Sequence, residues 1–264
     1  MRWYRDRQPY SGLPSARTAI GDTGVVDIIG ESFTSYGLGH RLMLILTAVG
    51  IVALIPFGRR LRGSVAETRI SRAFGVALLT ISTINLAIGL WPANFVLALS
   101  LPLHFSDALR FIAGYALLTR RPWAVAITYY WGLTLNPQAL LTPTLTYNLA
   151  PWYDFTVYWA QHIGVMWAAV WLTWGLGLSP TWRDYRRSMI ITVGWAALAF
   201  TVNVVARTDY GFLNGKPSGG SALDLLGPWP WYLASEAAAM IIIWALITWP
   251  WAVLSRRGTP ASPP

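Results

Sequence analysis

The chain has 264 residues, of which 55% are hydrophobic and only 12% are charged. Because soluble domains carry about 25% charged residues, this composition excludes an ordinary soluble protein and favours one compact membrane bundle. The sequence has no cysteine, which excludes disulfides, cysteine–zinc sites, iron–sulfur clusters and a thiol nucleophile. The net charge of +9 comes from arginines clustered between apolar stretches, a pattern typical of lipid-facing loops rather than of nucleic-acid binding.

The first 38 residues are too polar for a signal peptide, since charged residues are scattered through them. We expect this segment to lie on the membrane surface or to pack over the bundle. A membrane domain follows over residues 39–254, and residues 255–264 form a short tail that we expect to be disordered.

Seven apolar stretches of about 20 residues follow, each long enough to cross a bilayer as a helix. They cover residues 39–57, 73–92, 95–119, 123–142, 155–178, 188–206 and 230–254. The sequence therefore predicts an all-α polytopic bundle of seven transmembrane helices. Sixteen Trp and twelve Tyr are expected mainly as interfacial anchors near the span ends.

The loops between these stretches alternate in charge. The first, third and fifth loops and the tail hold arginines, whereas the second and fourth loops hold no Arg or Lys; the basic set is Arg59, Arg60, Arg62, Arg69, Arg72, Arg120, Arg121, Arg183, Arg186, Arg187, Arg256 and Arg257. Positively charged loops stay in the cytoplasm. The predicted topology is therefore N-terminus outside and C-terminus inside, in a plasma membrane.

Polar residues occur at a similar depth in the outer half of several predicted spans. His104, Asp107 and Arg110 follow one another at spacings of three, which would place them on one face of a continuous helix. His162 and Glu236 fall roughly 9–14 Å below the outer end, as His104 does, at 1.5 Å per residue. Ionisable groups inside spans are costly and mark candidate sites, so we predict an outward-facing polar cavity.

Several chemistries remain open for this cluster. Each residue alone could be a hydrogen-bonded packing residue, and the His104–Asp107–Arg110 series could be a packing salt bridge. No HxxxH or HExxH spacing supports a metal site, and no cofactor is expected. Proton relay, transport of a polar substrate and acyl transfer are the functional alternatives. Acyl transfer would use Ser106 as nucleophile, His162 or His104 as base, and Asn136 or Gln138 as oxyanion donors.

Five stretches together resemble the YwaF-like bacterial integral membrane proteins. They are residues 101–107 (LPLHFSD), 131–143 (WGLTLNPQALLTP), 161–162 (QH), 203–217 with its YGFLNGKP run, and 226–232 (LGPWPWY). These proteins are distantly similar to transmembrane protein 164, an acyltransferase that makes ether phospholipids. The resemblance implies a nucleophile at Ser106, where many relatives have Cys, and a matching histidine at His162.

The leading hypothesis is thus a lipid acyltransferase or hydrolase in the bacterial inner membrane, with membrane lipids as partners. Its candidate catalytic residues are Ser106, His162, His104 and Asp107. Its candidate substrate-binding residues are Asn136, Gln138, Gln161, Asn203, Asn214, Lys216, Glu236 and Arg110. A transporter, a lipid-binding carrier and an accessory subunit of a membrane complex are the alternatives. Because Ser is a weaker nucleophile than Cys, loss of the chemistry is a further one.

Overall fold

The computed structural model describes residues 28–216 and 222–257, and the described part is all-helical, without strands. The predicted N-terminal segment and tail therefore lie largely outside the described residues. The main helices are α2 (Leu38–Leu61), α3 (Val65–Leu90), α5 (Phe105–Thr119), α6 (Pro122–Tyr130), α7 (Asn136–Leu141), α8 (Pro151–Val170), α9 (Trp182–Ala206) and α10 (Trp231–Arg257).

Short elements complete the architecture. A four-residue helix, α4 (Leu97–Ser100), precedes α5, and two 3-10 turns, η3 (Tyr210–Phe212) and η4 (Ala222–Leu226), lie between α9 and α10. Two π-helical turns, η1 (Trp131–Leu135) and η2 (Trp171–Gly175), continue α6 into α7 and extend α8. Each of the seven predicted stretches thus corresponds to one helix or to one series of helical segments.

The helix ends follow local sequence signals. Ser64 accepts a hydrogen bond from the Glu67 backbone N–H at the start of α3, and Thr181 and Asp184 form a reciprocal capping box at the start of α9. Pro122 and Pro151 open α6 and α8, where the missing N–H of proline costs nothing.

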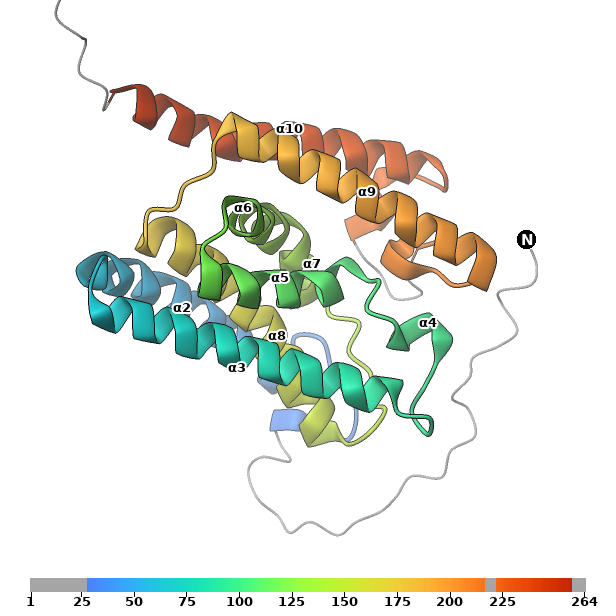
Figure 1. Ribbon diagram of the computed structural model, residues 1–264. Helices are drawn as coiled ribbons and strands as arrows, with labels where there is room; N and C mark the ends of the chain where they lie inside the picture. Colours follow the sequence, from blue (N-terminus) through green and yellow to red (C-terminus); the bar gives the residue numbers. More distant parts are fainter. Residues whose placement is uncertain (1–27, 217–221, 258–264) are drawn as a thin grey trace, which may run out of the picture.

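Four helices are long and apolar enough to cross a membrane by length and composition: α2, α3, α9 and α10. In Figure 1, α9 and α10 lie along one side of the molecule and α2 and α3 along the opposite side, with α5 and α6 between them. The outer helices expose many apolar side chains, whereas every residue from Ala124 to Tyr130 in α6 is buried. The chain is therefore a multi-pass membrane protein with a buried centre and apolar outer helices.

The helix predicted over residues 95–119 is broken. Residues 101–104 separate α4 from α5, and Leu101 is extended, as expected of a residue that precedes a proline, here Pro102. His104 is the extended N-cap of α5 rather than a helical residue. The predicted stripe of His104, Asp107 and Arg110 on one helix face is therefore wrong for His104.

The tryptophans do not serve only as interfacial anchors. Trp131, Trp159, Trp171 and Trp244 are fully buried. Three of them donate their indole N–H to hydroxyls of other segments, as Trp131 does to Thr192 at 2.8 Å. Buried Trp thus supplies core volume and directional bonds between helices here.

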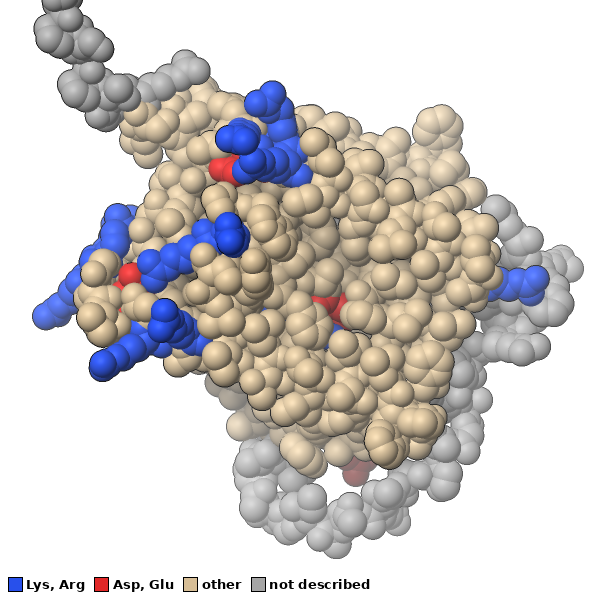
Figure 2. Space-filling view, in the orientation of Figure 1, with Lys and Arg blue, Asp and Glu red and all other residues tan. Residues whose placement is uncertain are grey.

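The arginines gather at one end of the bundle. Figure 2 shows most of the basic side chains of this face at the end where the α2–α3 and α5–α6 turns and the start of α9 lie. The loops predicted to share one side of the membrane therefore share one end of the structure.

Candidate functional site

The centre of the candidate site is a pair of side chains, His162 of α8 and Asn136 of α7. The ring Nδ1 of His162 lies 2.8 Å from Asn136 Oδ1, and Asn136 Nδ2 donates to the His162 backbone carbonyl at 2.9 Å. A carbonyl oxygen can only accept, so this second bond fixes which end of the amide faces the ring. Asn136 Oδ1 is then the acceptor, and Nδ1 of His162 must carry the proton.

This arrangement sets the tautomer of His162. With the proton on Nδ1, the Nε2 atom keeps its lone pair, and among the described residues it accepts no hydrogen bond. The ring of Tyr158, one turn earlier on α8, lies 4.4 Å from the imidazole between ring centroids, and its hydroxyl donates to the Ala139 carbonyl at 2.7 Å. His162 is therefore held in one orientation, with the lone pair of Nε2 unoccupied.

The π-helical turn places Asn136. Pro137 lacks an N–H and would clash with the preceding turn of a regular α-helix. In η1 the Asn136 backbone N–H instead bonds the Trp131 carbonyl, five residues back. This wider turn shifts the register of the helix just before Pro137, and the shifted Asn136 side chain meets α8.

Arg110 adds a third helix, α5, to this site. Its Nη1 lies 3.0 Å from Asp107 Oδ1 and 2.9 Å from Gln161 Oε1, the residue next to His162. Gln161 is only 5% exposed. Among the described residues, Gln161 Nε2 and Arg110 Nε are buried and donate to no acceptor. Two donor nitrogens therefore remain without an acceptor, and buried donors of this kind usually have a partner.

Ser106 lies on the face of α5 that carries Arg110. Four residues of helix rotate the side chain by only about 40°, so Ser106 lies one turn from Arg110, toward the start of α5. It is partly buried, and its hydroxyl makes no hydrogen bond to any described residue. In particular, it does not hydrogen-bond His162.

The remaining predicted residues either belong to a hydrogen-bond network around the α9–α10 loop or make no polar side-chain contact with the described residues. His104 contacts the α9–α10 loop, where its Nδ1 accepts the Gly211 N–H at 3.3 Å and its ring lies beside Tyr210 and Phe212. Asn203 also belongs to this loop network, because its side-chain amide bonds Thr208, Tyr210 and Asn214.

Lys216 lies 3.7 Å from Asp224 and over the ring of Tyr232. Burial raises the pKa of Asp209, a carboxyl in the same loop. The hydrogen bond from the Asn214 N–H acts in the opposite direction and is the smaller effect. Gln138 and Glu236 make no side-chain hydrogen bond or ion pair with the described residues. The structure thus gathers Asp107, Arg110, Asn136, Gln161 and His162, and it places His104, Asn203, Asn214 and Lys216 in a neighbouring loop network.

Comparison with known proteins decides the family. The model of the TMEM164 family matches residues 35–248, which is 214 of the 264 residues. The chain belongs to the TMEM164 family. No curated protein and no solved structure matches the chain. The matched range contains every candidate residue, so the whole predicted site lies inside the TMEM164 region.

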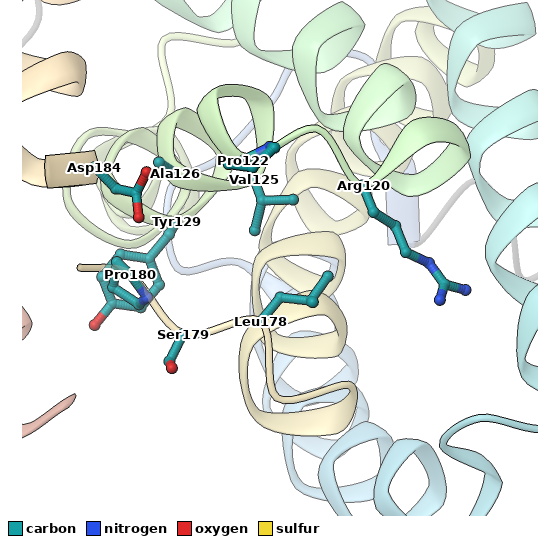
Figure 3. Close-up of a pocket in the computed structure, with 9 residues that line it drawn as sticks. All are labelled: Arg120, Pro122, Val125, Ala126, Tyr129, Leu178, Ser179, Pro180 and Asp184. Carbon is teal, nitrogen blue, oxygen red and sulfur yellow. The ribbon is translucent and has the colours of Figure 1, made fainter. Parts of the chain in front are cut away.

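Two pockets are described in this TMEM164 protein, and both lie at its basic end. The first, of about 240 Å³, is lined by Arg120, Tyr129, Asp184 and the loop over residues 178–180, among others (Figure 3). Figure 3 shows Arg120 turned away from Tyr129 and Pro180; its guanidinium pairs with Glu67 of α3. None of the predicted site residues lines either pocket, and the outward-facing cavity stays a prediction.

Sequence reasoning missed two contacts between polar side chains, one inside the candidate site and one outside it. Tyr158 precedes His162 by four residues, a spacing that puts both on one face of α8 and could have revealed the contact. Glu67 was also missed: it is 2% exposed and receives hydrogen bonds from Ser71 and Arg120. Glu67 begins a helix beside a Ser N-cap, so its sequence signal indicates a cap rather than a buried ion pair.

Proposed function

We propose that this chain transfers or hydrolyses an acyl group of a membrane lipid, with Ser106 as nucleophile and His162 as general base. The observation that carries the proposal is the Asn136–His162 pair, because it fixes the proton on Nδ1 and leaves Nε2 free to accept one. An oriented histidine with a third group behind it is the arrangement that activates hydroxyl and thiol nucleophiles. The family name is consistent with this chemistry.

The proposed reaction has two steps, formation of an acyl-serine and its breakdown. His162 Nε2 takes the proton of the Ser106 hydroxyl while Ser106 Oγ attacks the ester carbonyl, and the imidazolium then protonates the departing alcohol. In the second step, His162 deprotonates water or a lipid hydroxyl, which attacks the acyl-serine. The imidazolium returns that proton to Ser106 Oγ as the acyl–oxygen bond to the serine breaks and the product leaves. Attack requires Ser106 Oγ to come within hydrogen-bond reach of Nε2 when the substrate binds.

Arg110 and Gln161 are assigned to stabilising the oxyanion in this mechanism, because each has a buried donor nitrogen without an acceptor among the described residues. During each attack the carbonyl oxygen becomes an anion, which is stabilised by N–H groups that are already oriented toward it. Gln161 Nε2 and Arg110 Nε are buried and have no acceptor among the described residues, and Gln161 precedes His162 directly on α8. Asp107 holds the Arg110 guanidinium through its 3.0 Å ion pair.

The test uses the purified protein in lipid nanodiscs with a fluorophosphonate probe and intact-mass detection of acyl-serine. We expect the probe to modify Ser106, with labelling and lipid-ester turnover lost in Ser106→Ala and at least about 100-fold slower in His162→Ala. Ser235→Ala, which removes a hydroxyl from α10, is the control for the loss of a serine.

Asn136 is a positioning residue in this scheme. Asn136→Ala should slow turnover at least about tenfold, and Asn136→Asp should recover part of it by again accepting from Nδ1. Asn94→Ala, which removes an amide side chain from the loop between α3 and α4, is the control and should leave turnover unchanged. Turnover that survives in both Ser106→Ala and His162→Ala would refute the mechanism. Absence of any turnover in the wild type, with lipid-dependent uptake of a substrate into vesicles, would favour the transporter instead.

A further inference from the structure

The second pocket is a groove of about 570 Å³ between the α5–α6 turn and α9. It is lined by Tyr115, Arg121, Pro122, Trp123, Arg187, Ile190 and Ile191. These residues combine two guanidinium groups with an aromatic and aliphatic wall. The groove lies apart from His162 and Ser106, neither of which lines it.

The two arginines are available to a ligand. Arg121 is exposed and forms no ion pair with any described residue. Arg187 has one ionic contact, to Asp184 at 3.9 Å, and its side chain is 41% exposed. Guanidinium groups bind phosphate through paired N–H donors, so two of them at one groove favour a phosphate-bearing partner.

The wall of the groove is apolar and faces outward. Ile190 is 71% exposed, and the rings of Tyr115 and Trp123 stack with centroids 5.6 Å apart. On α9, Ile190 and Ile191 follow Arg187 by three and four residues, so they lie on the same helix face about 5 Å further along the axis. α9 has the length and composition of a membrane span. The apolar wall therefore continues from the cationic end into the region that lipid chains occupy.

We propose that this groove binds an anionic phospholipid, with its headgroup phosphate between Arg121 and Arg187 and an acyl chain along Tyr115, Ile190 and Ile191. Free phosphate would use only the arginines and would leave the exposed apolar wall uncovered. An acidic protein would not need a wall that continues along a membrane-spanning helix. The position at the end where the basic side chains gather supplies the matching charge (Figure 2).

The test measures lipid retention by native mass spectrometry after release from nanodiscs that hold equal amounts of phosphatidylglycerol and phosphatidylcholine with the same acyl chains. The wild type should retain phosphatidylglycerol selectively. Arg121→Gln with Arg187→Gln should weaken retention by roughly thirty-fold, as expected for the loss of two cations near an anionic lipid. Inorganic phosphate at millimolar concentration should not displace the lipid.

Arg60→Gln with Arg69→Gln is the matched control, because it removes the same charge from two exposed arginines that do not line the groove. An equal loss in this control, or equal retention of phosphatidylcholine, would overturn the proposal in favour of diffuse attraction. A photoreactive phosphatidylglycerol on the wild-type protein tests the site without any variant. Crosslinks should map to Tyr115, Ile190 or Ile191, and crosslinks confined to other helices would also overturn the proposal.

Discussion

At the residue scale, the two partners of the Glu67–Arg120 ion pair differ strongly in burial. Glu67 is 2% exposed, whereas the side chain of its partner Arg120 is 38% exposed. Glu67 also accepts from the Ser71 hydroxyl at 3.1 Å, which in turn accepts the Trp171 indole N–H at 2.9 Å. The anion is thus fixed inside the bundle, while the cation can reach the surface.

This asymmetry predicts unequal effects of removing the two charges. Arg120→Gln leaves a charged carboxylate buried without a cation and should destabilise the fold by about 3 kcal/mol. Glu67→Gln keeps an acceptor for Ser71 and leaves an arginine that can turn to solvent. The free energy of unfolding should therefore fall by only about 1 kcal/mol. Thermal unfolding in one detergent measures both, and a larger loss in Glu67→Gln would contradict the explanation.

At the element scale, close contact between helices depends on small residues at a few positions. α3 and α5 approach at Gly75 and Gly114, where a Cβ on Gly75 would lie 2.9 Å from the Gly114 carbonyl oxygen. A Cβ on Gly114 would lie 2.6 Å from the Leu79 side chain. Small residues allow such approach in membrane bundles, where packing replaces the hydrophobic effect as the force between helices. This interface holds α5, and hence Arg110, against the rest of the bundle.

Two alanine substitutions in α3 test the packing. Gly75→Ala should destabilise the protein by about 1–3 kcal/mol, because the new methyl group would lie only 2.9 Å from the Gly114 carbonyl oxygen. Gly89→Ala, in the last turn of the same helix, meets no atom within 4 Å and should be neutral or slightly stabilising through helix propensity. Unfolding midpoints in detergent give both values; equal effects of the two substitutions would rule out a steric role for Gly75.

At the scale of the whole molecule, charge divides the bundle into two ends. The first, third and fifth loops, which hold Arg60, Arg121 and Arg183, lie at the end where basic side chains gather (Figure 2). The second loop, with Ala93, joins α3 to α4 at the other end of α3. We propose that the basic end faces the cytoplasm, because positively charged loops are retained there.

The cysteine-free sequence gives a direct test of this orientation. Ala93→Cys and Arg60→Cys each place one thiol at an exposed position on opposite ends of the bundle. In right-side-out vesicles, a membrane-impermeant maleimide should label the cysteine at position 93 at once, and the one at position 60 only after the membrane is opened. The reverse pattern would invert the topology.

The sequence by itself determined where the helices lie. Apolar stretches, Pro122 and Pro151 at helix starts, and the Thr181–Asp184 cap are local signals, and the seven predicted stretches correspond to the observed helical segments. It also named the polar residues of the candidate site and indicated the TMEM164 family, whose model then matched. Roles within the site stay predictions, because sequence supplies residue types and approximate depth only.

The tertiary structure alone decided which of these residues meet. His162 and Asn136 are 26 residues apart and Arg110 and Gln161 are 51 apart, so their contacts depend on how three helices are rotated against one another. That rotation follows from the π-helical turn before Pro137 and from close packing at Gly75 and Gly114. The break before α5, which removes His104 from the helix face, also needed the tertiary structure, because Pro102 predicts a kink but not its extent. Side-chain pairing is set by packing across the bundle, which no local pattern in the chain records.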